Sequence, residues 1–583
     1  MAALKIENLI TDHLDLWTAA VRPKSSAGRG SNSKLELTGI KKLRELILEL
    51  AVRGKLVPQD PSDEPASVLL ERIAAAKARL VKEGKIKKLK ALPEIAEEEK
   101  PFELPEGWEC IRLGELTSKM GSGSTPRGGQ SAYVSEGIPF LRSQNVWNEG
   151  LRLDDVVYID ENTHLKMEGT KVIPGDVLLN ITGASLGRTL IFPDSIKEAN
   201  VSQHVTIIRL LIDELAPFVH LGIKSPLVQN LIWGRQVGMA IEGLSKRTLE
   251  LFEFPVPPLA EQHRIVAKVD ELMALCDQLE QCSESLLAAH QTLVETLLAT
   301  LTDSGDADEL AQNWARLSTH FDTLFTTEAS IDALKQTILQ LAVMGKLVPQ
   351  DPSDEPASVL LERIVAEKAK LVKEGIYQKT SKLLPKKNIE LPSGWVSVQI
   401  GELCPSIVPN RDKPKTFSGT IPWVTLPSFP VDSWYLDSKD IELGLTTEEV
   451  MEYSARIIPS NSVLMSCVGR FGLSAINTIP VSSNQQVHAF IVLNGLSPEY
   501  LSCVIRVVGS HLYEIASATT IAYINKTKCE SIQFGLPPAG EQFRIVAKVD
   551  ELMTLCDQLK SRLQTSQQTQ LALAESLVEG ALV

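Results

Sequence analysis

Two blocks of this sequence occur twice almost unchanged, and this duplication constrains the fold more than any other feature. Leu50–Ile73 reads LAVRGKLVPQDPSDEPASVLLERI, and Leu341–Ile364 differs from it at one of 24 positions. Glu261–Leu279 returns as Glu541–Leu559 with two differences in 19 positions. A repeat of this kind indicates one structural unit used twice. We therefore predict a fold with an internal pseudo-two-fold repeat.

The stretches between these blocks are far less alike, although short similarities keep them in register. Leu104-Pro-Glu-Gly-Trp108 corresponds to Leu391-Pro-Ser-Gly-Trp395 at their beginnings. Pro257-Pro-Leu-Ala-Glu-Gln262 corresponds to Pro537-Pro-Ala-Gly-Glu-Gln542 at their ends. The chain therefore combines a constant frame with two variable segments.

The constant frame has a helical pattern. After the Pro-Pro motif of each copy, apolar residues recur at helical spacing. A seam at seven-residue intervals runs through Ile265, Leu272, Leu279, Leu286 and Leu293. A heptad seam of this length predicts a left-handed pair of long helices. The alternative is that each helix only buries this face against its own domain.

The variable segments, residues 108–257 and 395–537, contain short β-branched runs separated by glycines, which is typical of sheet cores. We predict an α+β fold in which two globular α/β modules are separated by long antiparallel helical (coiled-coil) spacers. The expected domains are 1–99 (helical), 100–258 (first module), 259–389 (central helical spacer), 390–538 (second module) and 539–583 (helical).

Composition and missing motifs narrow the function. The eight cysteines form no C-x-x-C pair, the histidines lack zinc-ligand spacing, and no apolar run reaches 18 residues. We therefore expect a cytoplasmic protein without a metal site or a membrane segment. No phosphate-binding P-loop, nucleophile elbow or zinc-hydrolase motif occurs, and we assign no catalytic residue.

The net charge of the chain is unfavourable for binding one class of partner. The chain carries a formal charge of −14, and each variable segment has three more acidic than basic residues. A uniformly basic surface that holds nucleic acid without sequence preference is therefore excluded.

The duplicated helical frame, the LPxGW entries, the Pro-Pro-Leu-Ala-Glu-Gln exit and the two unlike modules resemble the DNA-specificity subunit of type I restriction-modification enzymes. The resemblance extends over the whole chain and is greatest to the enterobacterial subfamily with a long N-terminal conserved region. The second exit departs from the pattern, with Ala539-Gly540 in place of Leu259-Ala260.

This resemblance implies a function for each part. Each module would be a target-recognition domain that reads one half of an asymmetric, interrupted double-stranded DNA site. The helices would set the spacer and dock two modification (methyltransferase) subunits, and restriction/translocase subunits would join the full complex. No cofactor is expected on this chain, because S-adenosylmethionine, ATP and Mg would belong to the partner subunits.

The residues that contact DNA are chosen by chemistry, since arginine and lysine pair with guanine, and asparagine and glutamine with adenine. An ordinary surface role is the alternative for each of them. The candidates of the first module are Thr125, Arg127, Arg142, Gln144, Asn145, Arg188, Gln203 and His204, with Lys246 and Arg247 on phosphate. Those of the second are Asn410, Arg411, Lys413, Lys415, Arg470, Gln485 and Gln486, with Tyr523, Lys526 and Lys528 on the backbone.

Two other functions remain open from the residues alone. One is a duplicated coiled-coil adaptor whose variable modules bind protein rather than DNA. The other is an enzyme whose active site is dispersed over the sequence. The helices add a hypothesis of their own, because about 23 helical residues span the ~34 Å of one DNA turn. The helix from Glu261 would then determine the length of the unread spacer.

Overall fold

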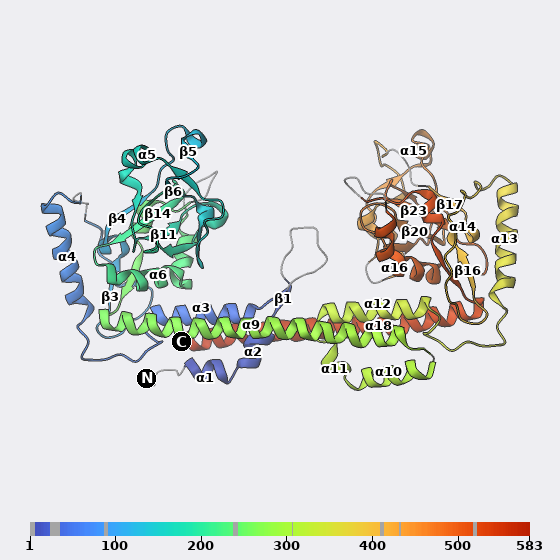
Figure 1. The fold of residues 1–583 in the computed structure, drawn as a ribbon, viewed down its shortest axis with the longest axis horizontal. Helices are drawn as coiled ribbons and strands as arrows, with labels where there is room; N and C mark the ends of the chain where they lie inside the picture. Colours follow the sequence, from blue (N-terminus) through green and yellow to red (C-terminus); the bar gives the residue numbers. More distant parts are fainter. Residues whose placement is uncertain are drawn as a thin grey trace. The chain divides into compact units, whose positions relative to one another are not determined.

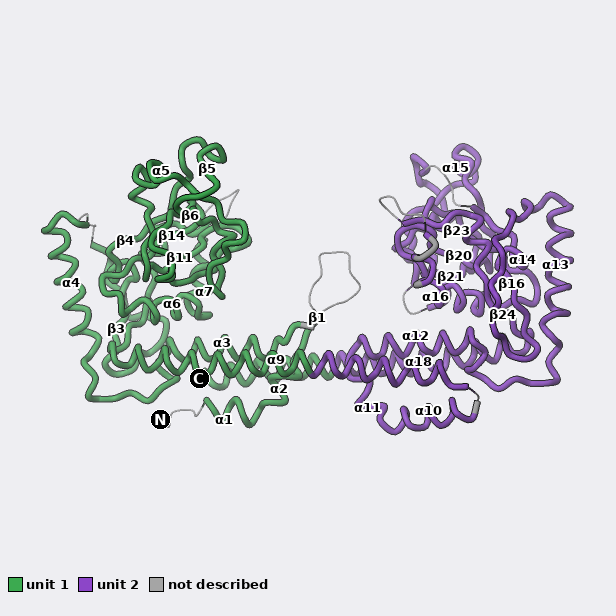
Figure 2. Tube along the Cα trace, viewed as in Figure 1, with its two compact units in different colours: residues 1–285, 566–583 green, residues 286–565 purple. Residues whose placement is uncertain are grey.

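The computed structural model describes residues 6–23, 35–86, 91–236, 243–305, 307–408, 413–430, 433–516 and 522–582. The chain forms two compact units (Figure 2). The first unit contains residues 1–285 and 566–583, and the second contains residues 286–565. Each unit combines one mixed module with helices of the constant frame.

Two long helices, α9 and α18, supply helical segments to both units. In the first unit they are joined by short helices from the N-terminal part of the chain, and in the second by equivalent helices from its middle (Figure 1). The frame helices are α1 (Ile6–Thr11), α2 (Leu14–Ala19), α3 (Thr38–Val52), α4 (Ala66–Lys82), α9 (Leu259–Asp303), α10 (Ala307–Thr319), α11 (Phe321–Leu324), α12 (Glu328–Val343), α13 (Ala357–Lys373) and α18 (Ala539–Leu582). A short ribbon, β1 (Arg22–Pro23) with β2 (Leu35–Glu36), precedes α3.

The duplication extends to the N-terminal helices, whose sequences alone do not reveal that they belong to the repeat. His13-Leu-Asp-Leu-Trp17, in and before α2, corresponds to His320-Phe-Asp-Thr-Leu324 around α11. Trp17 and Leu324 are both buried. Only the histidine and the aspartate are identical between these segments, so the signal was too weak to find without the structure.

The first module (residues 108–257) has a five-stranded sheet of order β10-β13-β6-β9-β5 and a four-stranded antiparallel sheet of order β12-β11-β14-β4. The ribbon β15-β3 closes it next to α9. Its strands are β3 (Glu109–Arg112), β4 (Thr117–Ser122), β5 (Tyr133–Val134), β6 (Ile138–Leu141), β7 (Val146–Trp147), β8 (Gly150–Leu151), β9 (Val157–Ile159), β10 (Lys171–Val172), β11 (Val177–Asn180), β12 (Thr189–Ile191), β13 (Ala199–Val201), β14 (Val205–Leu210) and β15 (Glu253–Val256). Its helices are α5 (Glu161–Lys166), α6 (Ala216–Lys224), α7 (Pro226–Gly234) and α8 (Lys246–Glu250).

The second module (residues 395–537) repeats this plan with fewer strands. Its sheets have the orders β17-β23-β20-β21, β19-β18-β22 and β16-β24. The strands are β16 (Val396–Gln399), β17 (Ser406–Ile407), β18 (Ile421–Val424), β19 (Gly444–Leu445), β20 (Ser462–Ser466), β21 (Ser474–Ile476), β22 (Ser482–Ser483), β23 (Val487–Ile491) and β24 (Gln533–Leu536). The helices are α14 (Ile400–Leu403), α15 (Thr447–Glu452), α16 (Pro498–Ile515) and α17 (Lys526–Glu530). The predicted α+β fold with two modules on a repeated helical frame is confirmed.

Each module is attached to its long helix by a buried tryptophan. Trp108 Nε1 donates to Glu261 Oε2 at 3.0 Å, and Trp395 Nε1 donates to Glu541 Oε2, also at 3.0 Å. Burial raises the pKa of both carboxyls, and the indole N–H opposes that shift. The Pro-Pro exit motif and the LPxGW entry motif are therefore two halves of one contact.

A glycine at the end of α3 makes room for this tryptophan. Gly54 has a φ of +68°, and a Cβ atom there would lie 2.6 Å from Pro105 and 2.9 Å from Trp108. Gly345 repeats the arrangement after α12 with a φ of +71°. Both glycines therefore end a helix in the left-handed conformation and admit the indole ring.

The buried stripe of α9 follows the predicted seam only at its beginning. Ile265 and Leu272 are fully buried, and Leu279 is half-buried. Leu286 and Leu293 are 69% and 51% exposed, so the strict heptad seam is wrong beyond the third position.

The reason is the pitch of the helix. A straight α-helix falls about 20° behind a seven-residue repeat in each heptad, or about 60° after three heptads. Burial therefore passes to the next residue along, and Val294 and Leu301, seven residues apart, are buried instead.

Replacing Trp108 by Phe should weaken the attachment of the first module. The substitution removes the indole donor and leaves the buried carboxylate of Glu261 without its partner. We expect the free energy of unfolding of the first unit to fall by about 2–4 kcal/mol. Hydrogen exchange should reveal faster exchange at the beginning of α9.

Trp233→Phe is the matched control, since Trp233 is 54% exposed in the same unit. Trp395→Phe should have the same effect confined to the second unit. Equal exchange rates in Trp108→Phe and Trp233→Phe would show that the hydrogen bond does not attach the module.

Candidate nucleic-acid interface

Two parallel strands of the first module end side by side and define an edge of polar side chains. β6 and β13 pair in parallel, and Ser202 N donates to Leu141 O at 2.9 Å directly after the paired residues. The next residues along each strand are Arg142 and Gln203. Because the carboxyl ends of parallel strands meet at one edge, two predicted residues about 60 positions apart are brought together.

A glycine-rich loop closes over this edge and delivers a third residue. Gly123 N donates to Val205 O at 3.0 Å, and a Cβ atom on Gly123 would lie 1.8 Å from Val201 O. The close approach therefore requires glycine. Thr125 Oγ1 then donates to Gln203 Oε1 at 3.1 Å. This bond orients the exposed amide group of Gln203.

His204 connects the same edge to the residues that precede α8. Thr182 Oγ1 and His204 Nδ1 are 2.7 Å apart, and Ile181 N donates to His204 O at 3.0 Å. Leu244 N in turn donates to Ile181 O at 2.8 Å, which brings the start of α8 to this edge.

Two cations lie at the first turn of α8. Lys246 and Arg247 are exposed there, and they lie 3.4 Å and 4.0 Å from Glu250. Ser245 caps the helix by accepting from Thr248 N at 3.0 Å. Exposed ion pairs of this length are weak, so both cations can turn to an external anion.

Arg188 is held by an aromatic ring that is not among the predicted site residues. The ring of Trp147 lies between Arg188 and Arg152, whose guanidinium carbons are 3.6 Å and 3.5 Å from its centroid. Stacking on both faces fixes two positive charges next to each other. Trp147 follows a run of polar residues that were predicted to contact DNA. An aromatic residue among arginines is the sequence signal that could have identified it.

The remaining candidates of the first module differ in their exposure. Arg127 and Gln144 are exposed, and Gln144 Nε2 donates to the carboxylate of Asp155. Arg142 is half-buried and donates to Asp155 O at 2.7 Å.

Asn145 is fully buried, accepts from Arg142 N at 2.9 Å and donates to Arg152 O at 2.9 Å. Both ends of the Asn145 amide are therefore hydrogen-bonded within the module, so Asn145 is not one of the exposed candidates.

The second module builds the same edge with different side chains. β18 and β22 pair in parallel, and Asn484 N donates to Val424 O at 3.0 Å. Cys467 N donates to Gln486 O at 2.9 Å, as Ile181 N does to His204 O. Gln485, at the position of Gln203 in the repeat, is exposed.

The other candidates of the second module differ in their exposure and contacts. Arg470 and Lys415 are exposed, as is Lys413, which stacks on Phe417 at 5.7 Å. Tyr523 is 45% exposed, and Val468 forms a β-bridge with it.

Lys526 lies 3.6 Å from Glu530 in α17, and Lys528 N donates to the Asn525 cap at 2.9 Å. Asn410 and Arg411 lie outside the described residues.

Neither a metal centre nor a membrane segment is found in the part of the chain that the structure describes. Within it, no three His, Cys, Asp or Glu side chains are placed to hold a metal ion. None of its helices is long and apolar enough to cross a bilayer.

Comparison with known proteins identifies the family. Residues 105–287 and 392–566 each match the type I restriction modification DNA specificity domain. The chain is 43% identical over 609 residues to the specificity subunit of the type I restriction enzyme EcoEI of Escherichia coli, covering 99% of this chain and 100% of that protein. It is 40% identical over 608 residues to the EcoAI specificity subunit of Escherichia coli, with the same coverage.

A solved chain from a type I restriction-modification system overlaps with a TM-score of 0.48 at 17% identity, covering 83% of this chain and 99% of that one.

The chain therefore belongs to the family of type I restriction-modification DNA specificity subunits, and its two modules are DNA target-recognition domains. This confirms the function predicted from the repeat and its motifs. The adaptor alternative, in which the modules bind protein, receives no support.

The stacked tryptophan provides a test of the interface. Trp147→Ala should release Arg188 and Arg152, and the assembled complex should bind its DNA target about threefold to tenfold more weakly. Titration of a labelled duplex measures the change. Trp233→Ala, which removes an exposed indole elsewhere in the module, is the control. Equal affinities of the two variants would contradict the role of the stack.

Proposed function

We propose that each module reads one half of a bipartite DNA site through the edge described above, and that the chain itself catalyses no reaction. The observation that carries the proposal is that one backbone arrangement recurs with different side chains. Ile181–His204 and Cys467–Gln486 make the same backbone hydrogen bond, but the neighbouring exposed residues differ. A common scaffold with different polar groups suits two unlike half-sites.

The side chains divide between bases and phosphates. Gln203 and Gln485 are exposed at the edges of the two modules, and glutamine pairs with adenine in the major groove. Arg188, fixed on Trp147, suits the acceptors of guanine. Lys246 and Arg247 lie on a helical turn at the flank, where they would hold phosphate and set the register.

The charge of the modules limits their affinity. Each module carries three more acidic than basic residues, so few phosphates can be neutralised by this chain alone. Partner subunits would supply the other cationic contacts, and the isolated chain should bind DNA weakly at physiological salt.

The frame supports a symmetric assembly. Arg264 bonds Asp63 at 2.5 Å in the first unit, and Arg544 bonds Asp354 at 2.7 Å in the second. Such repeated surfaces suit two copies of one partner, which we propose to be two modification subunits. Restriction/translocase subunits would complete the complex. S-adenosylmethionine, ATP and Mg would be held by these partners.

Gln203→Ala should relax specificity in one half-site only. We expect a loss of about 1–3 kcal/mol of discrimination at one base pair, because the amide no longer recognises it. Methylation by the assembled complex of duplexes substituted at each position measures the loss. Gln485→Ala should act on the other half-site. Equal relaxation of both halves by either variant would contradict the assignment.

The helical spacer gives an independent prediction. Inserting four residues between Leu279 and Leu293 lengthens α9 by about 6 Å and adds about one helical turn. The unread spacer of the DNA site should lengthen, while both half-sites stay the same. Mapping methylated sites in DNA from cells with the variant complex measures this. An unchanged spacer would rule out the helix as a ruler.

A further inference from the structure

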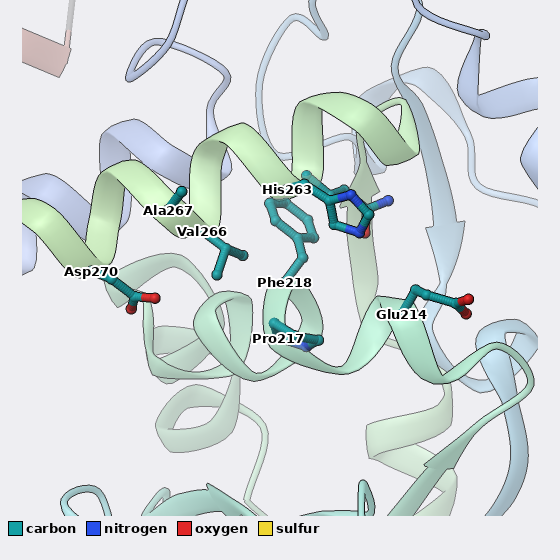
Figure 3. Close-up of a pocket in the computed structure, with 8 residues that line it drawn as sticks. Glu214, Pro217, Phe218, His263, Val266, Ala267 and Asp270 are labelled. Carbon is teal, nitrogen blue, oxygen red and sulfur yellow. The ribbon is translucent and has the colours of Figure 1, made fainter.

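The first unit has an open pocket where its module meets the long helix. A pocket of about 220 Å³ lies between α6 and the start of α9. Pro217 and Phe218 form one side and Val266 and Ala267 the other, and Asp270 lies at one end (Figure 3). Glu214 lies at the other end, and Gln262 and His263 complete the lining, so the two apolar sides are bordered by a carboxylate at each end.

A buried acceptor in this pocket has no partner. Gln262 lines the pocket and is 1% exposed, and its Nε2 donates to Pro257 O at 2.9 Å. Within the described ranges, its Oε1 accepts no hydrogen bond. In the second unit the equivalent Gln542 Oε1 accepts from Ser497 N at 2.7 Å. A buried carbonyl without a donor is costly, so the first unit lacks at this point a hydrogen bond that stabilises the second.

The equivalent place in the second unit is covered by a tryptophan of the chain itself. Asp550 occupies the position of Asp270 in the repeated block, and Trp434 Nε1 donates to it at 2.6 Å. Arg506, which holds in α16 the position of Lys224 in α6, stacks on the Trp434 ring at 4.4 Å. The indole is thus held by a carboxylate at its N–H and by a cation on its face.

The first module cannot fill its own pocket in this way. In the second module, Trp434 lies next to β21, because Ile476 N donates to Trp434 O at 2.8 Å. The corresponding strand of the first module, β12, is bordered instead by the β7–β8 hairpin, whose Trp147 is stacked between two arginines. The carboxylate of Asp270 therefore has no indole from its own module.

We propose that the pocket of the first unit receives a tryptophan side chain from a protein partner that docks along α9. Apolar cavities of about 150 Å³ hold a benzene ring, so this volume accommodates an indole. The ring N–H would bond Asp270, as the indole of Trp434 bonds Asp550 in the second unit. The choice of a modification subunit as that partner rests on the proposed function. Its two copies would then dock differently on the two units.

The chemistry of the pocket can be tested on the full chain without DNA. Binding of 5-fluoroindole, followed by ¹⁹F NMR, should saturate at one site per chain. Asp270→Ala should weaken that binding at least tenfold, whereas Glu284→Ala, which removes an exposed acid from the same helix, should leave it unchanged. Trp434→Ala should raise the number of sites from one to two. Equal binding by the Asp270→Ala and Glu284→Ala variants, or no binding at all, would overturn the proposal.

The partner is tested in the assembled complex. Ala267→Trp places an indole of the chain itself in the pocket, and it should weaken the binding of one of two modification subunits at least tenfold without affecting the other. Native mass spectrometry over a titration measures both steps. Unchanged binding of both copies would show that no tryptophan of the modification subunit occupies the pocket. Half-site specificity, a separate measurement, would still test the proposed function.

Discussion

The hydrogen bond between a buried indole and a glutamate is the contact on which the arrangement of each unit depends. It links the residue where a module begins to the helix that follows the module, and it occurs twice with the same length. The glycine that ends α3 or α12 leaves space for that indole. Since the tryptophan, the glutamate and the glycine are the same in both copies, each module is attached in the same way whatever its loops contain. The loops are then free to differ, which is what two unlike half-sites require.

The sequence predicted the repeated parts of this structure. The other parts could not be predicted from it, for physical reasons. Identical blocks indicated the frame, because near-identical sequences fold alike. The seam through Leu286 and Leu293 was wrong, because a straight helix does not keep a seven-residue period. Arg142 and Gln203 were chosen by residue type alone, and their proximity depends on the parallel pairing of β6 and β13. Asn145 had the same chemistry as its neighbours but is buried, and no local pattern distinguishes it.

Small differences between the two units follow from the variable segments and carry functional meaning. Lys224 and Arg506 take equivalent positions, as do Asp270 and Asp550, yet among the described residues only Asp550 has an indole over its carboxylate. A quasi-symmetric frame can thus present one open and one filled site to two copies of the same partner. The acidic balance of both modules bears on the same assembly, since we propose that partner subunits supply phosphate contacts that these modules cannot make alone.

We propose that the reading of one half-site by one module is independent of the other module. It is tested most directly by replacing residues 395–537 with a second copy of residues 108–257 and mapping the adenines methylated by the assembled complex. We expect a symmetric site in which both halves equal the half read by the first module. Retention of the original asymmetric site by this variant would contradict it.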